Sequence, residues 1–288
     1  MTEEGRKGHG GRKASLDMMR SFCVMARHLN LSRSAELLDL TRQTIRRHIH
    51  LIEESRGERL FELKDKKYHL TEAGRAALDG AESIVAKGLA WLKGQYDVRD
   101  GLQAIRIRDD DGRPVFFSNQ HKLTRIWEDG TDLLQRAFHC WVEAKGAIES
   151  EKFAPVRPFV LVFRRYKSEW LCAEIGEKSA LAKWFGWEWA KSSIGRHIDE
   201  IPATTIYGEY IADAYNEVRK TASPRLDHQF RRTARKIGGP LEPMSVQRLL
   251  LSCKFPDGDM ALVSVVHMTH DVEIPGLDRK YIEMSNPV

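Results

Sequence analysis

Residues 41–57 read TRQTIRRHIHLIEESRG, and this stretch decides the fold of the N-terminal part of the chain. Ile45, Ile49 and Ile52 recur at helical spacing, which predicts a helix with one apolar face. Thr41 can cap the start of this helix, and Gly57 can end it. The opposite face carries three arginines and no acid between positions 42 and 50. An apolar inner face and a basic outer face are what a helix in a DNA groove needs.

The neighbouring residues predict a winged helix-turn-helix. Residues 16–29 have apolar side chains at helical spacing, and Ser32 can cap a short helix that runs to Leu38. A tight turn at positions 39–41 then leads into the basic helix. Residues 60–63 and 68–70 flank a Lys-Asp-Lys-Lys turn and predict a two-stranded wing. Thr71 opens a long helix that extends to about Lys93, with alanines and glycines on one stripe.

Residues 16–92 resemble the N-terminal domain of the LysR-type transcriptional regulators. The resemblance is carried by LDMMRSF at 16–22, LSRSAELL at 31–38, LTRQTIRR at 40–47, IEE at 52–54, RLFE at 59–62 and LTEAG at 70–74. It implies an all-α winged helix-turn-helix over residues 15–70 and a linker helix over 71–93 that pairs two protomers. The family often has proline where Gln43 stands and a smaller residue where Arg46 stands, so its consensus operator does not transfer directly.

The residue types of the basic helix and the wing suit contacts with duplex DNA. Arginine can bind guanine O6 and N7 through two hydrogen bonds, and glutamine can bind adenine N6 and N7 in the same way. Arg47 and His50 are better placed for phosphates. The predicted DNA-binding residues are Arg33, Thr41, Arg42, Gln43, Thr44, Arg46, Arg47, His50, Lys64, Lys66 and Lys67. The predicted dimerisation residues on the linker helix are Ala77, Ala81, Ile84, Val85 and Gly88.

The pattern changes after Gly94. An Asp111-Gly112 hairpin signal and an amphipathic stretch at 131–150 are interpreted as a connecting hairpin and helix over residues 94–157. Residues 158–166 and 170–176 predict strands, 179–220 predict helices, and 226–237, 246–255 and 260–270 predict three more strands. This order predicts an α+β domain over residues 158–271, with one antiparallel sheet covered by helices on one side. Residues 1–14 and 272–288 are interpreted as a disordered tail and a C-terminal tail.

The C-terminal order resembles a PAS sensory domain and lacks the strand–helix alternation of the usual LysR effector half. We therefore expect residues 155–288 to fold alone and to hold a ligand between the helices and the sheet. Trp184, Leu249, Leu251 and Phe255 are the predicted pocket residues. His267 and His270 would point to opposite faces of a strand, so no metal site is predicted. No catalytic triad can be argued from the sequence, and the identity of any cofactor stays unknown.

Charge and composition restrict the function further. The net charge is +5, and it is confined to residues 1–93, because residues 94–288 hold 28 basic and 28 acidic side chains. The four cysteines are scattered, which fits a reducing cytoplasm, and no apolar run is long enough for a membrane span. These features predict a cytoplasmic, non-enzymatic transcription regulator. It would bind double-stranded DNA as a homodimer or homotetramer and respond to a small-molecule effector or a partner. An enzyme with a DNA-binding arm and a ligand-independent architectural DNA binder are the alternatives.

Overall fold

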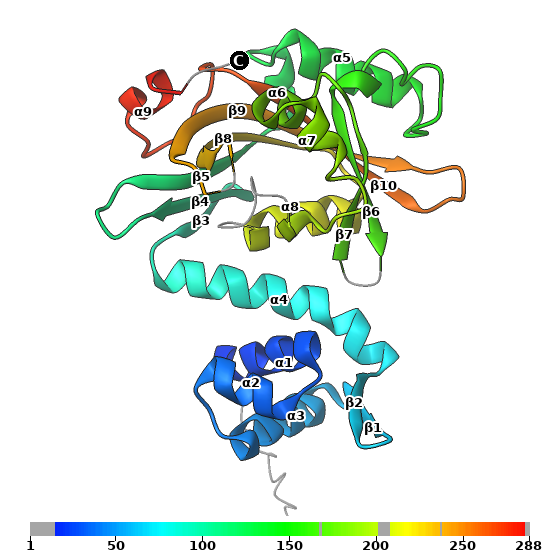
Figure 1. The fold of residues 1–288 in the computed structure, drawn as a ribbon, viewed down its shortest axis with the longest axis vertical. Helices are drawn as coiled ribbons and strands as arrows, with labels where there is room; N and C mark the ends of the chain where they lie inside the picture. The colour runs from blue at the N-terminus through cyan, green and yellow to red at the C-terminus, as the bar shows by residue number, and fades with distance from the viewer. Residues whose placement is uncertain (1–14, 167–168, 201–207, 237, 286–288) are drawn as a thin grey trace, which may run out of the picture. The chain divides into compact units, whose positions relative to one another are not determined.

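The computed structural model describes residues 15–166, 169–200, 208–236 and 238–285 (Figure 1). The chain divides into two compact units, Met1–Leu89 and Ala90–Val288, and each is described by itself. The predicted disordered tail at 1–14 lies outside the described residues. Across the described ranges, no helix combines the length and the apolar character needed to cross a bilayer.

The N-terminal unit has the predicted winged helix-turn-helix order. Its elements are α1 (Leu16–His28), α2 (Leu31–Leu38), α3 (Arg42–Arg56), β1 (Phe61–Lys64), β2 (Lys67–Leu70) and α4 (Glu72–Leu92). The predicted ends of α3 are confirmed: the Thr41 hydroxyl accepts from the backbone N–H of Thr44 at 3.1 Å, and Gly57 has a φ of 70°. The cap of α2 differs from the prediction. Asn30 caps this helix, because its side-chain oxygen accepts from two backbone N–H groups.

A small core joins the helices of this unit to the wing. Phe22 of α1, Ile52 of α3 and Leu60 before β1 are buried together with the first turns of α4. Gly74 is needed where α4 crosses the wing, because a Cβ at this position would lie 2.2 Å from the Leu60 carbonyl oxygen. The wing and α4 are therefore fixed to the same core as the basic helix.

The second unit is built on one eight-stranded antiparallel sheet. Its strands are β3 (Tyr96–Arg99), β4 (Leu102–Arg108), β5 (Pro114–His121), β6 (Val160–Tyr166), β7 (Glu169–Ile175), β8 (Arg225–Ala234), β9 (Leu241–Lys254) and β10 (Met260–Met268). The order across the sheet is β3-β4-β5-β8-β9-β10-β6-β7. The five predicted strands are present and adjacent. The expectation of a separate connecting hairpin before residue 158 is corrected. β3, β4 and β5 extend the same sheet, because β5 pairs with β8.

Helices cover both faces of this sheet, whereas we expected them on one side. On one face lie α6 (Ala180–Phe185), α7 (Trp187–Lys191), η3 (Ile198–Glu200) and α8 (Gly208–Thr221). On the other lie η1 (Leu123–Trp127), α5 (Asp132–Glu143), the segment 144–156 and η2 (Arg157–Phe159). Figure 1 shows α5 and α8 on opposite sides of the strands. The central strands explain this, since β9 and β10 are buried almost continuously and need cover on both faces.

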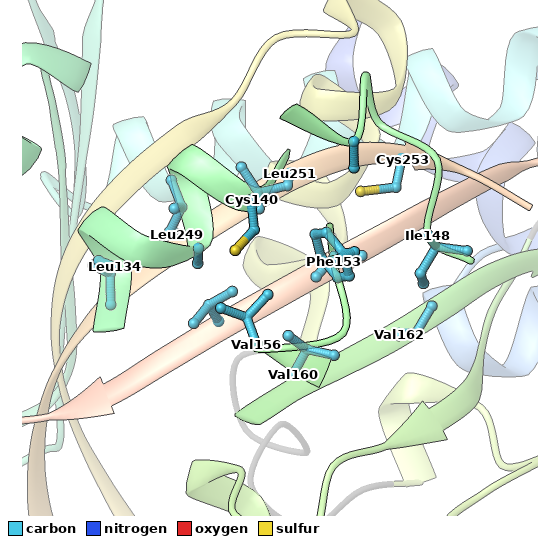
Figure 2. Close-up of a cluster of buried hydrophobic side chains, with 14 of the residues drawn as sticks. Leu134, Cys140, Ile148, Phe153, Val156, Val160, Val162, Leu249, Leu251 and Cys253 are labelled. Atoms are coloured by element: carbon cyan, nitrogen blue, oxygen red, sulfur yellow. The ribbon is translucent and has the colours of Figure 1, made fainter. Parts of the chain in front are cut away.

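The face under α5 carries a large apolar cluster. Leu249, Leu251 and Cys253 alternate along β9 and point toward α5 and Phe153, as Figure 2 shows. Their shared, buried face was predicted from the period of two.

The prediction of a C-terminal tail over residues 272–288 is also corrected, because the described part of this segment packs on the sheet. Two of these residues, Val272 and Ile274, precede α9 (Arg279–Glu283), and Ile282 lies on it. All three are buried against Phe117 and Phe230. Polar contacts also fix this segment to the strands, as shown by the 3.0 Å hydrogen bond from the Glu273 N–H to Nδ1 of His228. Burial lowers the pKa of His228 to about 3, so this ring stays neutral and can accept that bond.

A buried ion-pair network lies on the opposite face, under α8. Asp227 is fully buried and contacts Arg225 at 2.9 Å and Arg248 at 2.7 Å. Arg225 also contacts Glu217 of α8 at 2.6 Å. Burial acts to raise the pKa of Asp227, but the two guanidinium charges outweigh it and hold the pKa below its ordinary value. The network ties β8 and β9 to α8, and three of its four charged groups are buried, while Glu217 at its edge is 29% exposed.

Candidate nucleic-acid interface

The basic helix α3 is anchored on its inner face and open on its outer face. Ile45 is completely buried and Ile52 nearly so, whereas Arg42, Gln43, Arg46, Arg47 and His50 are exposed. Thr41 and Thr44 hold the first turn through a hydroxyl–hydroxyl hydrogen bond of 2.9 Å. The helix thus presents a polar surface near its N-terminus, as a groove helix does.

Most of the predicted DNA-binding cations have no acidic partner. Arg42, Arg46, Arg47, Lys66 and Lys67 make no ion pair within the described ranges of the chain. Three other predicted residues are paired on the surface, and their contacts are Arg33–Glu36 at 3.2 Å, His50–Glu54 at 3.4 Å and Lys64–Glu62 at 2.8 Å. Exposed pairs of this kind are weak, so phosphates can displace them. The interface therefore offers cations that need little desolvation before they contact DNA.

The wing presents its lysines on a tight turn. Asp65 and Lys66 both have a left-handed backbone, with φ of 49° and 61°, which is the geometry of a two-residue hairpin turn. The register of the hairpin pairs Lys64 with Lys67, so all three lysines lie at the tip.

Two polar residues that position the interface were missed as site residues. His48 lies on the inner face of α3, where its Nδ1 is 2.8 Å from the hydroxyl of Ser21. That hydroxyl donates to the Asp17 carbonyl oxygen at 3.0 Å, so the imidazole is the donor to Ser21. Burial, followed by the charge of Arg47, lowers the pKa of His48. Its spacing of three from Ile45 and four from Ile52 places His48 on the inner face of the helix, whereas His50 falls on the outer face.

Glu53 is the second missed residue, and it fixes the wing to α3. One carboxylate oxygen accepts from the N–H groups of Leu60 at 2.8 Å and Phe61 at 3.1 Å, and the other accepts from Arg59 at 2.9 Å. The side chain is only 7% exposed. The carboxylate therefore sets the position of β1 relative to the helix that carries Arg46. Its place in the IEE motif was visible in the sequence, but its role was not.

The predicted dimerisation stripe requires correction. Ala81 and Val85 are buried in the core of their own unit, together with Phe22 and Leu78. A Cβ at Gly88 would lie 3.0 Å from Leu16, so this glycine also faces α1. The small side chains allow close packing, as predicted, but within one chain. Ile84, in contrast, is 55% exposed, and Trp91 and Leu92 are also exposed on α4.

The predicted ligand pocket also requires correction. Leu249 and Leu251 lie in the cluster under α5, with Phe255 packed at its edge. Trp184 lies in another cluster with Met244 and Val246, on the opposite face of β9. Leu249 and Leu251 share one face of β9, whereas Val246 and the Trp184 packed on it belong to the other, so these four side chains do not converge on one cavity.

Metal and nucleophile chemistry finds little support among these residues. Within the described parts of the chain, no group of three or more His, Cys, Asp or Glu side chains is arranged to hold a metal ion. Burial raises the pKa of both Cys172 and Cys253 to about 12, so neither thiol is ionised near neutral pH.

The family match lies within the N-terminal unit. Residues 16–75 match the family described as "Bacterial regulatory helix-turn-helix protein, lysR family". The "RuBisCO operon transcriptional regulator" of Acidithiobacillus ferrooxidans is 34% identical over 92 residues, which are 32% of this chain and 29% of that protein. The "Uncharacterized HTH-type transcriptional regulator YbhD" of Escherichia coli K12 is 32% identical over 75 residues, or 26% and 24% of the two chains.

A solved transcriptional regulator of the LysR family from Eggerthella lenta is 36% identical, with a TM-score of 0.22. It covers 23% of this chain and 94% of its own. This chain thus spans less than a third of the length of the curated relatives that it matches. Residues 16–75 form a LysR-family helix-turn-helix domain.

Proposed function

We propose that this chain is a dimeric, sequence-specific DNA-binding transcription regulator, with a sensing unit at residues 90–288. The observation that carries the proposal is the exposed face of α3, where Arg42, Arg46 and Arg47 surround Gln43 without acidic partners among the described residues. The family match of residues 16–75 supports the same conclusion.

The geometry supports a division of roles within the interface. Arg46 lies one turn into α3, exposed at the side of the buried face of Ile45 and Ile52, and it lines the hollow between this helix and the wing. A long donor at this position can reach base edges when α3 lies in the major groove. Lys66, at the tip of the wing, can reach only the backbone of a neighbouring groove.

The first prediction separates base contacts from phosphate contacts. Arg46→Ala should lower affinity for the selected operator by about 1–3 kcal/mol and relax the base preference at one position. Lys66→Ala should weaken binding to all sequences alike and lower the salt slope by about one. Binding of operator and random duplexes over a salt series measures both effects. Equal losses on operator and random DNA for Arg46→Ala would show that Arg46 contacts only phosphate.

The oligomer is proposed to form through the exposed face of α4. Ile84 is a large apolar side chain that the unit leaves in water, and Trp91 and Leu92 both lie about two turns further along the same helix. A two-fold contact would bury this exposed face of one protomer against the same face of the other. Two N-terminal units joined in this way would contact two half-sites spaced by whole helical turns.

The second prediction tests this face. Ile84→Glu should convert the protein to monomers and weaken operator binding, because both protomers would bring a charge into one apolar contact. Ala76→Glu is the matched control, since Ala76 is also exposed on α4. Analytical ultracentrifugation measures the oligomer. A dimer of unchanged strength in Ile84→Glu would place the interface elsewhere. Ala81→Glu is not suitable, because it would bury a charge in the core of the unit.

The alternative of an enzyme in the C-terminal unit has no specific observation in its favour. Burial keeps the thiols of Cys172 and Cys253 un-ionised near neutral pH. A sensing role fits better with a large sheet unit attached to a DNA-binding unit.

A further inference from the structure

A cavity of about 380 Å³ opens in the C-terminal unit where four segments meet. These segments are the start of α5, the end of η2 at Phe159, residues 178–183 in the loop before α6 and its first turn, and the last residues of β10. The volume lies within the range of about 300–1,000 Å³ that small-molecule sites occupy. The sequence prediction had placed the ligand pocket elsewhere.

The strand pairing explains why the sheet is open at this point. β6 pairs with β10 only over Ala261–Val265, and the chain enters β6 at Val160. The following residues of β10, Val266 to Met268, therefore lie beyond the end of β6. α5 and α6 approach this edge from the two faces of the sheet. A ligand here would contact elements from both layers.

Basic side chains surround the cavity without acidic partners. Arg136 comes from α5, Lys178 from the loop before α6, and Lys183 from α6 itself. None of the three makes an ion pair or a side-chain hydrogen bond within the described part of the chain. One acidic residue, Asp132, also lines the cavity. This local excess of positive charge contrasts with residues 94–288 as a whole, which carry equal numbers of basic and acidic side chains.

The remaining lining suits an organic molecule that carries a charged group. Leu133, Phe159 and Met268 provide apolar surface. The hydroxyl oxygen of Thr131, at the start of α5, is buried and has no hydrogen-bond partner. His267 adds a ring that burial and the nearby charge of Lys183 keep neutral, by lowering its pKa. Arg136, Lys178 and Lys183 are exposed at the rim, and they converge with a neutral ring and an unpaired hydroxyl around apolar surface, which is typical of a ligand site.

We propose that this cavity, which we call the anion cavity, binds a small organic anion. Arg136, Lys178 and Lys183 contact its carboxylate or phosphate group, and its carbon skeleton lies on Phe159 and Met268. Lysine and arginine form their strongest hydrogen bonds with these two anionic groups. This inference rests on the proposed function, because it assigns the signal of the sensing unit to a chemical class and a place.

The test measures anion binding by the full-length protein through tryptophan fluorescence during thermal unfolding. All seven tryptophans lie at or after position 91, so the signal reports the unit that contains the cavity. The probes are inorganic phosphate, glycerol phosphate, succinate and benzoate, each compared with sodium chloride at equal ionic strength. Succinamide and benzamide are the neutral counterparts of the two carboxylates. A ligand that binds only the folded state raises the melting temperature in a saturable way.

We expect at least one anion to raise the melting temperature, and its neutral counterpart to have no effect. The triple variant R136Q/K178Q/K183Q should bind that anion at least about tenfold more weakly, because it removes three charge-assisted contacts. The control variant K122Q/K152Q/K191Q removes the same charge from exposed lysines outside the cavity and should respond as the wild type does. A preference for phosphates or for carboxylates identifies the anionic group.

Two results would overturn the proposal. One is a wild type that responds to no probe beyond the salt control, and the other is an equal response of the triple variant and the wild type. DNA binding is measured separately, without added anion. If the triple variant lost DNA affinity while the control variant kept it, the basic residues would contact DNA instead. Failure of the wild type to bind any duplex would reject the proposed function, whereas anion binding would still be measured.

Discussion

A fragment of residues 90–288 is expected to unfold cooperatively, and a fragment of residues 155–288 is expected not to fold. This reverses the expectation from the sequence, which placed a complete domain after residue 155. The reason lies in the sheet, because the shorter fragment lacks β3, β4 and β5 and exposes the edge of β8 that pairs with β5.

The loss of apolar packing makes this effect large. The shorter fragment lacks seven buried members of the cluster under α5, drawn in part in Figure 2: Ile126, Leu134, Ala137, Cys140, Ala144, Ile148 and Phe153. It also exposes their partners on β9 and β10. Each large side chain that is left in water loses about 1.5–3 kcal/mol. The sum exceeds the total stability of about 5–15 kcal/mol that a folded domain has.

Circular dichroism and thermal melting of the two fragments provide the measurement. The 90–288 fragment should show mixed helix and strand content and one sharp transition. A cooperative melt of the 155–288 fragment with the same signature would contradict the interpretation, and would show that β6 to β10 form a core without α5.

Asp227→Ala is expected to destabilise the C-terminal unit by about 3–5 kcal/mol, since it leaves a buried guanidinium group without its carboxylate. Arg248 is 5% exposed and has Asp227 as its ion-pair partner, while Arg225 keeps Glu217. A charge in this position cannot recover its hydration, because the surrounding residues of β8 and β9 are buried. The loss in the free energy of unfolding should therefore approach the total stability of a marginally stable domain.

Urea unfolding followed by tryptophan fluorescence measures this change, since every tryptophan belongs to the C-terminal unit. Asp97→Ala is the matched control: it removes a carboxylate that contacts Arg99 at 2.8 Å on the surface of the same unit. Exposed pairs contribute at most about 1 kcal/mol, so this variant should unfold close to the wild type. If the two variants unfolded at the same urea concentration, the buried network would have no special role in stability.

The winged helix-turn-helix could be predicted because its signals are local. The spacing of Ile45, Ile49 and Ile52, the cap at Thr41 and the glycine at position 57 all act within one helix. The Lys-Asp-Lys-Lys turn acts within one hairpin. Residues on the outer face of α3 follow from the same periodicity, so the candidate DNA-binding surface was also visible in the sequence.

The sequence showed less clearly what packs against each face of α3 and α4. The small-residue stripe of α4 was correctly recognised as a surface for close packing, but the sequence could not say whether α1 or a second chain packs there. The helical period of α3 places His48 on the inner face and His50 on the outer face, but it does not identify Ser21 of α1 as the hydrogen-bond partner of His48. The residue that a buried side chain contacts depends on what the helix packs against, which a single helical period does not encode.

The sequence by itself determined five of the eight strands of the C-terminal sheet, their antiparallel arrangement with the two pairings that short turns make, and the shared face of Leu249, Leu251 and Cys253. Only the tertiary structure decided that β5 pairs with β8, about a hundred residues away, and that α5 covers the second face. The anion cavity also belongs to this second group, because Arg136, Lys178 and His267 come from three separate segments. Helical spacing, caps and turns act between near neighbours in the chain, whereas strand pairing and the convergence of side chains depend on contacts that form only when distant segments pack together.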